Sequence, residues 1–436
     1  MTSSSPRAEL ACTLGLHTDA YELTMLDAAL RSEGAELPAV FEVFSRALPP
    51  GYRYGVFGGL GRLVDAIGEF CFSEADLQYL EATRLVSGTA LRYLSTYRFR
   101  GRVDAYREGE VFFPFSPVLT VAATFGEAII METLVLSVLN HDSAVASAAS
   151  RMVEAARGRP LIEGGSRRTH EEAAVAAARA AYIAGFASTS NLEAGRRYGL
   201  PTAGTAAHAF VLAYPSELQA FAAQVASQGP GTTLLVDTYD TVEGIRNAVA
   251  VAGPALGAIR IDSGDLLTEV PRARRVLDEL GARDTKIIAS GDLSEDTIAR
   301  LADCPVDAFM VGTRVVLGPT PGFVYKLVAM GDGVPDHSGL RPVAKRSIGK
   351  ATTACPKRAF RRLDGDGHAT AEHLVLDERD VTDGRPLQVL VLDHGEIVHS
   401  PSLEEIRRHA AVARAELPDS VREVAAGPAA MLATVV

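Results

Sequence analysis

The sequence has few cysteines, and none of them stands in a pattern that binds metal or forms a disulfide framework. Four cysteines occur among 436 residues, at positions 12, 71, 304 and 355, and no two form a CxxC pair. Neither a zinc knuckle nor a disulfide scaffold is therefore indicated. A reduced cytosolic setting fits such sparing use of cysteine.

An excess of positive charge and a long apolar run are also absent. Lysine and arginine number 43 against 54 aspartates and glutamates, a formal net charge of -11. This balance argues against a nucleic-acid partner, because a phosphate backbone needs a basic face. The most apolar stretch, residues 116–140, is interrupted by Glu127 and Glu132 and falls short of the roughly 20 uncharged residues of a membrane span. The first residues lack the apolar core of a secretory signal, so we expect a cytoplasmic protein with no membrane partner.

Two common catalytic signatures are missing as well. The sequence contains no GxSxG turn of a serine hydrolase and no GxxxxGK[ST] phosphate loop. Its hydrophobic fraction of 47% and charged fraction of 22% are those of a globular protein. The length predicts two or three domains, at roughly 100–200 residues each.

The middle of the chain repeats one pattern, in which an apolar strand ends in a polar cluster and an amphipathic helix follows. About six or seven such units predict a parallel sheet closed into an irregular (β/α) barrel, whose polar loops share one rim. In the unit after Asp265, we expect Leu267, Val270, Leu277 and Leu280 to lie on the buried face of a helix. The alternative for each polar cluster is that its Ser or Asp only caps a helix.

The two ends of the chain differ from this middle part. Residues 1–118 mix short strands with helices, and residues 336–436 are basic, then turn-rich, then strand-like. We expect residues 119–335 to form the barrel, and the two end segments to pack together as a second α/β domain.

Carboxylates follow two neighbouring strands of the predicted barrel. Asp237 and Asp240 lie in "VDTYD", and Asp262 and Asp265 in "IDSGD". Carboxylates, waters and substrate phosphates are the ligands that Mg²⁺ prefers, so the two clusters predict a magnesium site. The alternative is two capped helices.

Two glycine turns follow the next two strands, Ser290-Gly291-Asp292 and Val311-Gly312-Thr313. Glycine lets backbone N–H groups approach an anion, and a following helix adds a favourable dipole. One such turn alone is weak evidence for a binding site, but two turns after consecutive strands predict a phosphate site.

Basic groups occur at two further strand ends. Arg167 and Arg168 follow a Gly-Gly pair in "EGGSRRTH". One interpretation is that they bind a carboxylate or phosphate through bidentate hydrogen bonds, and the alternative is an exposed basic helix start. His208 lies among very small residues in "LPTAGTAAHAFV" and is either a group that a bulky anion must reach or an ordinary helix-start residue.

In order along the chain, these segments resemble those of the nicotinate phosphoribosyltransferase family. The resemblance rests on "TDAYELTM", "FEVFSRALP", "EGGSRRTH", "STSNLEAGRRYGLPTAGTAAHAFV", "VDTYDT", "IRIDSGDL" and "PVAKRSIGKATTACPKRAFR". It implies a type II phosphoribosyltransferase fold, with a second domain built from both chain ends, and a homodimer with shared active sites. The implied reaction joins nicotinate to phosphoribosyl pyrophosphate, giving nicotinate mononucleotide and pyrophosphate in NAD salvage. ATP hydrolysis is coupled to it, and Mg²⁺ is the implied cofactor.

The resemblance also implies roles for individual residues. His208 matches the family's phosphorylated histidine, and Arg260 with Asp262 would hold the ribose and phosphate. Asp237 and Asp262 would reach Mg²⁺. Tyr21 would stack on the pyridine ring from the neighbouring subunit. The implied substrate-binding residues, besides those named above, are Asp19, Tyr21, Arg167, Ser190, Ser263, Gly291, Asp292, Gly312, Thr313, Lys345 and Lys350.

Three differences from the family's relatives bear on specificity. Ser190 stands where nicotinamide-using relatives have an aspartate, and a neutral side chain does not repel a carboxylate, which favours nicotinate. Gly164 stands where relatives have a bulky residue on the second ring face, so another side chain must fill that space. The cysteine knuckle of some relatives is missing, so we expect no structural zinc. The alternatives are a nicotinamide or quinolinate enzyme of the same fold, or a catalytically silent ligand-binding homologue.

Overall fold

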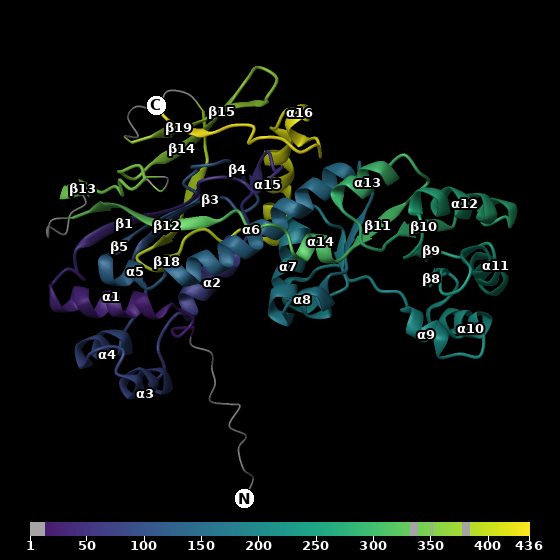
Figure 1. The fold of residues 1–436 in the computed structure, drawn as a ribbon, viewed down its shortest axis with the longest axis horizontal. Helices are drawn as coiled ribbons and strands as arrows, with labels where there is room; N and C mark the ends of the chain where they lie inside the picture. Colours follow the sequence, from purple (N-terminus) through teal and green to yellow (C-terminus); the bar gives the residue numbers. More distant parts are fainter. Residues whose placement is uncertain (1–13, 332–338, 349, 351, 377–383) are drawn as a thin grey trace, which may run out of the picture. The chain divides into compact units, whose positions relative to one another are not determined.

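The computed structural model describes residues 14–331, 339–348, 350, 352–376 and 384–436 (Figure 1). The chain divides into two compact units. The first combines the chain up to Ser143 with Thr320–Val421 and Ala426–Val436, and the second consists of Ala144–Pro319 with Arg422–Ala425. The first unit is thus built from both ends of the chain.

The first unit is organised around an antiparallel sheet of seven strands in the order β13-β12-β1-β5-β3-β17-β18. A four-stranded sheet, β16-β14-β15-β19, and the pair β2-β4 complete its strands. The bounds are β1 Pro38–Ser45, β2 Gly55–Val56, β3 Arg102–Tyr106, β4 Val111–Phe112, β5 Leu119–Thr124, β12 Phe323–Met330, β13 Arg341–Pro342, β14 Arg358–Leu363, β15 Ala369–Val375, β16 Arg385–Pro386, β17 Gln388–Asp393, β18 Glu396–Ile397 and β19 Ala433–Val435.

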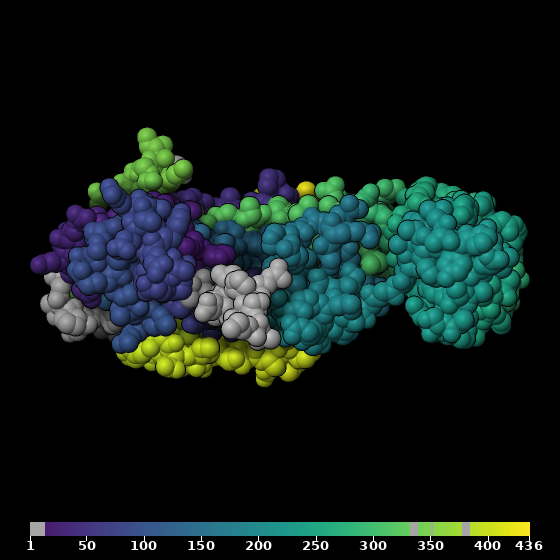
Figure 2. All heavy atoms as spheres, turned by 90° about the horizontal axis from the view of Figure 1, so that it is seen from below, coloured from purple at the N-terminus to yellow at the C-terminus, as the bar shows by residue number. Residues whose placement is uncertain are grey.

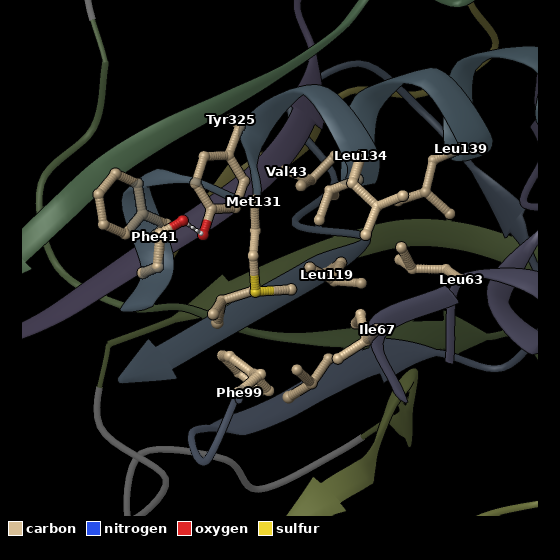
Figure 3. Close-up of a cluster of buried hydrophobic side chains, with 14 of the residues drawn as sticks. Phe41, Val43, Leu63, Ile67, Phe99, Leu119, Met131, Leu134, Leu139 and Tyr325 are labelled. Carbon is tan, nitrogen blue, oxygen red and sulfur yellow. Dashed lines mark hydrogen bonds between the residues drawn. The ribbon is translucent and has the colours of Figure 1, made fainter. Parts of the chain in front are cut away.

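Helices line the first unit and bury their apolar residues against these strands. Their bounds are α1 Ala20–Arg31, α2 Leu60–Glu69, α3 Glu74–Thr83, α4 Gly88–Ser95, α5 Phe125–Ile129, α15 Leu403–Ala415 and α16 Asp419–Arg422, whereas α6, Glu132–Ala155, contributes to both units. In α2, apolar residues recur at the three- and four-residue spacing of one helix face, and Leu63 and Ile67 are buried there. Figure 3 shows both beside Leu119 of β5 and Met131 in the same apolar core.

The second unit contains a six-stranded sheet, in which every strand pair is parallel, in the order β7-β6-β11-β10-β9-β8. The strands are β6 Leu161–Glu163, β7 Ser188–Thr189, β8 Thr233–Leu235, β9 Ala258–Ile261, β10 Lys286–Ala289 and β11 Ala308–Val311. All of them except β7 bury aliphatic or aromatic side chains, as expected for parallel strands covered by helices, and β6 and β9 also bury Glu163 and Arg260. The expected irregular barrel is confirmed, as a curled sheet that β7 and β8 leave incomplete.

Helices follow the strands of this sheet. They are α7 Glu171–Ala184, α8 Leu192–Tyr198, α9 His208–Leu212, α10 Glu217–Gln228, α11 Thr241–Ala252, α12 Leu266–Glu279, α13 Glu295–Leu301 and α14 Thr313–Val316, with a short 3₁₀ helix, η2, at Ser166–Arg168. Helices α10, α11 and α12 pack side by side, and α9 contacts α10. In Figure 2 the teal atoms of this part of the chain gather in one block.

The buried face of α12 differs in part from the expected one. Val270 and Leu277 are buried as predicted, but Leu266, rather than Leu267, completes the face. Leu280 is exposed, because the helix ends at Glu279 and Leu280 is its C-cap. Within the part of the chain that the structure describes, no helix is both long and apolar enough to cross a membrane.

Candidate active site

The polar loops at the carboxyl ends of the parallel strands surround a pocket of about 420 Å³ in the second unit. That volume lies in the usual range of small-molecule sites. The lining comes from the ends of β9 and β11 and from the loops after every strand of this sheet except β8. It consists of Gly164, Arg167, Arg168, Ser190, Gly204, Thr205, Ala206, Ala207, His208, Arg260, Asp262, Ser290, Gly291, Asp292, Met310, Gly312 and Thr313.

Two of the four strand-end carboxylates lie at this pocket. Asp237 is buried, and its Oδ2 accepts hydrogen bonds from the Asp262 N–H at 2.9 Å and the Ser263 hydroxyl at 2.6 Å. Its Oδ1 is buried without a hydrogen-bond partner. Asp262 Oδ1 accepts from the Ser290 hydroxyl at 2.5 Å. In each carboxylate, hydrogen bonds therefore fix one oxygen, and the other oxygen is left on the side of His208.

The remaining two carboxylates serve the local chain instead. Asp240 is the N-cap of α11, where its Oδ1 accepts from the Glu243 N–H at 2.9 Å. Asp265 precedes α12, and its Oδ2 accepts from the Thr268 hydroxyl at 2.6 Å. The capping interpretation therefore holds for Asp240, while Asp237 and Asp262 are not caps.

His208 begins α9, and its ring lies between hydroxyl and carboxylate groups. Nδ1 is 3.1 Å from Thr238 Oγ1. Nε2 is 3.8 Å from Asp237 Oδ1 and 3.9 Å from Asp262 Oδ2. These two gaps exceed hydrogen-bond length, and 37% of the side chain is exposed, so a ligand can reach the ring.

Arg260 supplies a buried positive charge from the end of β9. Its Nη1 donates to Thr205 Oγ1 at 2.7 Å, and Nη2 is 3.8 Å from Asp262 Oδ1. Nε is buried without a hydrogen-bond partner. Burial lowers the pKa of this guanidinium, while the charges of Asp262 and Asp237 counteract the effect. Because arginine stays charged, the group can hold an anion.

The glycine turns bring backbone to the pocket where a side chain would obstruct it. Gly291 has a φ of +94°, and a Cβ there would lie 2.1 Å from the Asp262 carbonyl oxygen. A Cβ on Gly312 would lie 3.3 Å from the Gly164 carbonyl oxygen. Only glycine therefore fits at 291, and Asp292 and Thr313 follow these glycines at the pocket.

Arg167 and Ser190 meet at the pocket because a buried carboxylate organises their loops. Glu163 ends β6 and accepts from the Gly165 N–H and, at 2.6 Å, from the Thr189 hydroxyl of β7. Burial raises the pKa of Glu163, and these two hydrogen bonds oppose the rise. Arg167 and Ser190 follow these two anchor points.

Not all of the predicted site residues line this pocket. Ser263 is outside the lining and donates to Asp237 instead. Asp237 is also outside the lining, although its Oδ1 lies 3.8 Å from Nε2 of His208, which lines the pocket. The others belong to the first unit, where Asp19 is exposed at the N-cap of α1 and Lys345 and Lys350 are exposed. Tyr21 is 45% exposed, and burial of the remainder, with Glu132, Glu22 and Asp19 nearby, raises its pKa to about 12.

Sequence reasoning named no role for several residues that build the pocket. Ser290, Thr205 and Thr238 hold Asp262, Arg260 and His208 in place. Each adjoins a residue that was singled out, but hydroxyl groups are too common for that position to identify them. Met310 also lines the pocket, and a Cβ on Gly164 would lie 2.7 Å from its Cε. Met310 thus fills the space that was expected to need another side chain.

The donor atoms present fit a hard divalent cation. Among the described residues, no three or more His, Cys, Asp or Glu side chains are grouped as metal ligands. Asp237 Oδ1 is nevertheless a buried carboxylate oxygen without a partner, and Asp262 Oδ2 lies on the same side of His208. Two carboxylates, with water and phosphate oxygens for the other positions, suit Mg²⁺.

Two family models cover most of the chain. The model of the nicotinate phosphoribosyltransferase (NAPRTase) N-terminal domain matches residues 16–140. The model of the quinolinate phosphoribosyl transferase C-terminal domain matches residues 145–318. The second match spans the strands and loops that form the pocket.

Proteins that are similar over most of this chain are named as nicotinate phosphoribosyltransferases. Nicotinate phosphoribosyltransferase pncB1 of Mycobacterium tuberculosis is 52% identical over 431 residues, which cover 96% of this chain and 94% of that protein. Nicotinate phosphoribosyltransferase of Bacillus subtilis is 36% identical, over 86% of this chain and 79% of that protein. The crystal structure of human nicotinic acid phosphoribosyltransferase matches at a TM-score of 0.81 and 27% identity, over 96% of this chain and 97% of that chain.

Proposed function

The chain belongs to the nicotinate phosphoribosyltransferase family, and we propose that it transfers the phosphoribosyl group of phosphoribosyl pyrophosphate to nicotinate. The products are nicotinate mononucleotide and pyrophosphate, and the reaction serves NAD salvage in the cytoplasm. The family resemblance read from the sequence is thereby confirmed. The observation that carries the proposal is the pocket, because His208, Asp262 and Arg260 line it together with two glycine turns.

The transfer step needs positioning and charge more than a strong base. The nicotinate ring nitrogen already holds a lone pair, which forms the new bond to the ribose carbon. At the same time the bond between that carbon and the pyrophosphate oxygen breaks, and pyrophosphate leaves with the electron pair. Arg260 and the backbone N–H groups around Gly291 and Gly312 are placed to hold the anionic groups of the sugar substrate. Donors fixed in advance where charge develops lower the barrier without reorganising during the step.

His208 couples ATP hydrolysis to this transfer. A ring nitrogen accepts the γ-phosphoryl group as the bond to the β-phosphate oxygen of ATP breaks, ADP leaves, and water later releases phosphate from the histidine. The small neighbours Gly204, Ala206 and Ala207 leave room for these groups to reach the ring. Phosphorylation adds negative charge beside Asp237 and Asp262, which strengthens the demand for a cation there.

Asp237 and Asp262 would hold Mg²⁺, with phosphate oxygens and water as its other ligands. When bound, the ion neutralises charge on the departing pyrophosphate. The chain's own part is to keep the two free carboxylate oxygens facing the pocket. The Ser263 and Ser290 hydroxyls do this by donating to the opposite oxygens.

The substrate carboxylate is recognised at the other end of the pocket. Arg167 faces the nicotinate side, and the neutral Ser190 accepts a carboxylate without repulsion. We propose a homodimer in which Tyr21 stacks on the pyridine ring from the neighbouring subunit, with Asp19 beside it. Lys345 and Lys350 add positive charge for the phosphates.

A substrate panel tests this function. Purified protein with phosphoribosyl pyrophosphate and Mg²⁺ is given nicotinate, nicotinamide or quinolinate, with and without ATP, and pyrophosphate release is measured. We expect nicotinate to be preferred and ATP to stimulate. Preference for nicotinamide or quinolinate would replace the substrate assignment. Binding of nicotinate without any mononucleotide would support a catalytically silent homologue.

The coupling is tested separately with His208→Ala. The variant should keep its fold, lose ATPase activity and retain reduced transferase activity that ATP no longer stimulates. His394→Asn, a change at an exposed turn of the first unit, is the matched control and should behave like the parent. An unchanged response of His208→Ala to ATP would contradict the phosphohistidine.

A further inference from the structure

Met310 of β11 forms part of the pocket wall, next to Gly164, the residue without a side chain that follows β6. Along β11, Phe309 and Val311 are fully buried, while Met310 between them lines the pocket, as the alternation of a strand requires. β6 pairs with β11 in parallel, with Ile162 opposite Met310. Gly164, two residues further on, therefore lies at the same edge.

A side chain at position 164 would compete with the Met310 side chain, in its present conformation, for the same space. A Cβ at Gly164 would lie 2.7 Å from Met310 Cε and 3.2 Å from Met310 Cγ. The three atoms nearest to that Cβ all belong to the Met310 side chain, so the methionine is the main obstruction to a side chain at 164. The apolar part of this wall can thus come from either strand, and in this chain it comes from β11.

Met310 is also the single long apolar side chain among the described residues that line the pocket. The remaining lining consists of charged and hydroxyl side chains, glycines, alanines and the imidazole of His208. Met310 Sδ is 3.9 Å from Arg260 Nη1, so this apolar surface adjoins the buried guanidinium. A flat aromatic ring that carries a charged group needs both an apolar surface for its face and a polar group at its edge.

We propose that Met310 is the specificity-determining residue on which the pyridine ring of the substrate lies. This inference rests on the proposed function, because it assigns one contact within that site. The thioether is polarisable and adapts its shape, which suits contact with an aromatic ring. Met310 should therefore affect the KM for the pyridine much more than the KM for phosphoribosyl pyrophosphate, whose anionic groups Arg260 and the glycine turns still hold.

A double-mutant cycle tests the assignment with four proteins: the parent, Met310→Ala, Gly164→Leu, and the two changes combined. Initial rates of mononucleotide formation give KM for nicotinate and, separately, for phosphoribosyl pyrophosphate. We expect Met310→Ala to raise the KM for nicotinate about tenfold, the scale of a lost apolar contact in a binding pocket. Gly164→Leu should impair nicotinate use more, and the combined variant should recover most of that loss, because the leucine then occupies the vacated space.

Met310→Leu is the conservative control and should stay within about threefold of the parent. A structural role for Met310 would instead change both KM values and the melting temperature together. That result, or a combined variant no better than Gly164→Leu, would overturn the inference. If the parent forms no mononucleotide from nicotinate, the proposed function fails. Calorimetric titration of nicotinate into the parent and Met310→Ala then still decides whether Met310 holds the pyridine, since equal affinities would refute it.

Discussion

The two units of the molecule each contain a cluster of buried charge, and the clusters are built in opposite ways. In the first unit, Arg361 of β14 is fully buried and lies 2.8 Å from Glu372 of β15. Arg385 of β16 lies 2.8 Å from Glu110 and 2.6 Å from Glu416. These short ion pairs tie three strands of one sheet to the start of β4 and the end of α15.

The pocket of the second unit keeps its charges further apart. His208 is 3.8 Å from Asp237 and 3.9 Å from Asp262, and Arg260 is 3.8 Å from Asp262. Buried atoms without a hydrogen-bond partner occur in both clusters, on Asp237 and Arg260 in the pocket and on Arg361 and Arg385 in the first unit. The difference therefore lies in the distances between opposite charges, since a close ion pair offsets the cost of burying its charges. The short pairs of the first cluster stabilise the fold, whereas the wider spacing in the pocket leaves its charges available to a ligand, as the proposed function requires.

The largest expected effect comes from breaking the closed cluster. Arg361→Met should lower the free energy of unfolding by about 3–5 kcal/mol, because it leaves Glu372 as a buried carboxylate without its cation, whereas Glu110 keeps Arg385. Denaturant unfolding measures the loss. Arg362→Met, a change at the exposed neighbour on the same strand, is the control and should change little. Equal stability of the two variants would show that the cluster is not stabilising.

Acid should weaken the same cluster over a defined range of pH. Burial tends to raise the pKa of Glu110, but hydrogen bonds from His409 and Arg385 and the charge of Arg361 lower it from 4.5 to about 2. A lowered pKa stabilises the folded state above pH 4.5, and this contribution is lost as the pH falls from 4.5 to about 2. The shift corresponds to about 3 kcal/mol. Unfolding between pH 6 and pH 2 should show a smaller loss of stability in Glu110→Gln than in the parent, and parallel curves would refute the assignment.

The smallest change in stability should come from the open cluster. Asp237→Asn removes a buried negative charge without a full set of partners, so the midpoint of unfolding should stay the same or rise. The kcat/KM for phosphoribosyl pyrophosphate should nevertheless fall about 100-fold, the usual effect of losing one fixed electrostatic group. Asp240→Asn, which keeps an N-cap on α11, is the matched control. A drop in stability with unchanged kinetics would reverse the comparison between the clusters.

Much of the second unit could be predicted from local patterns. Buried strands followed by polar clusters predicted parallel strands whose loops share one rim, and Gly291, Asp262 and His208 lie at that rim. Local pattern was insufficient at α12, where a one-residue error placed Leu267 on the buried face instead of Leu266. Neighbouring leucines look alike in sequence, and only packing against the sheet distinguishes them.

The closed cluster in the first unit could not be predicted in the same way. Arg361 and Glu110 are 3.7 Å apart in space but far apart in the chain. Arg361 ends one of the segments that carry the family resemblance, but nothing in that segment identifies Glu110 as its neighbour. Their proximity depends on strands from both chain ends joining in one unit. Met310 is a similar case, because its role depends on the missing side chain of Gly164 on the adjacent strand.

The sequence by itself determined the kinds of chemistry at hand, since residue type and spacing along one strand and its loop depend only on local geometry. It specified an imidazole among small residues, carboxylates at strand ends and glycines where backbone must approach a ligand. The tertiary structure alone decided which charges close on one another and which remain open. That distinction depends on distances of about one ångström between residues far apart in the chain, and such distances are set by packing.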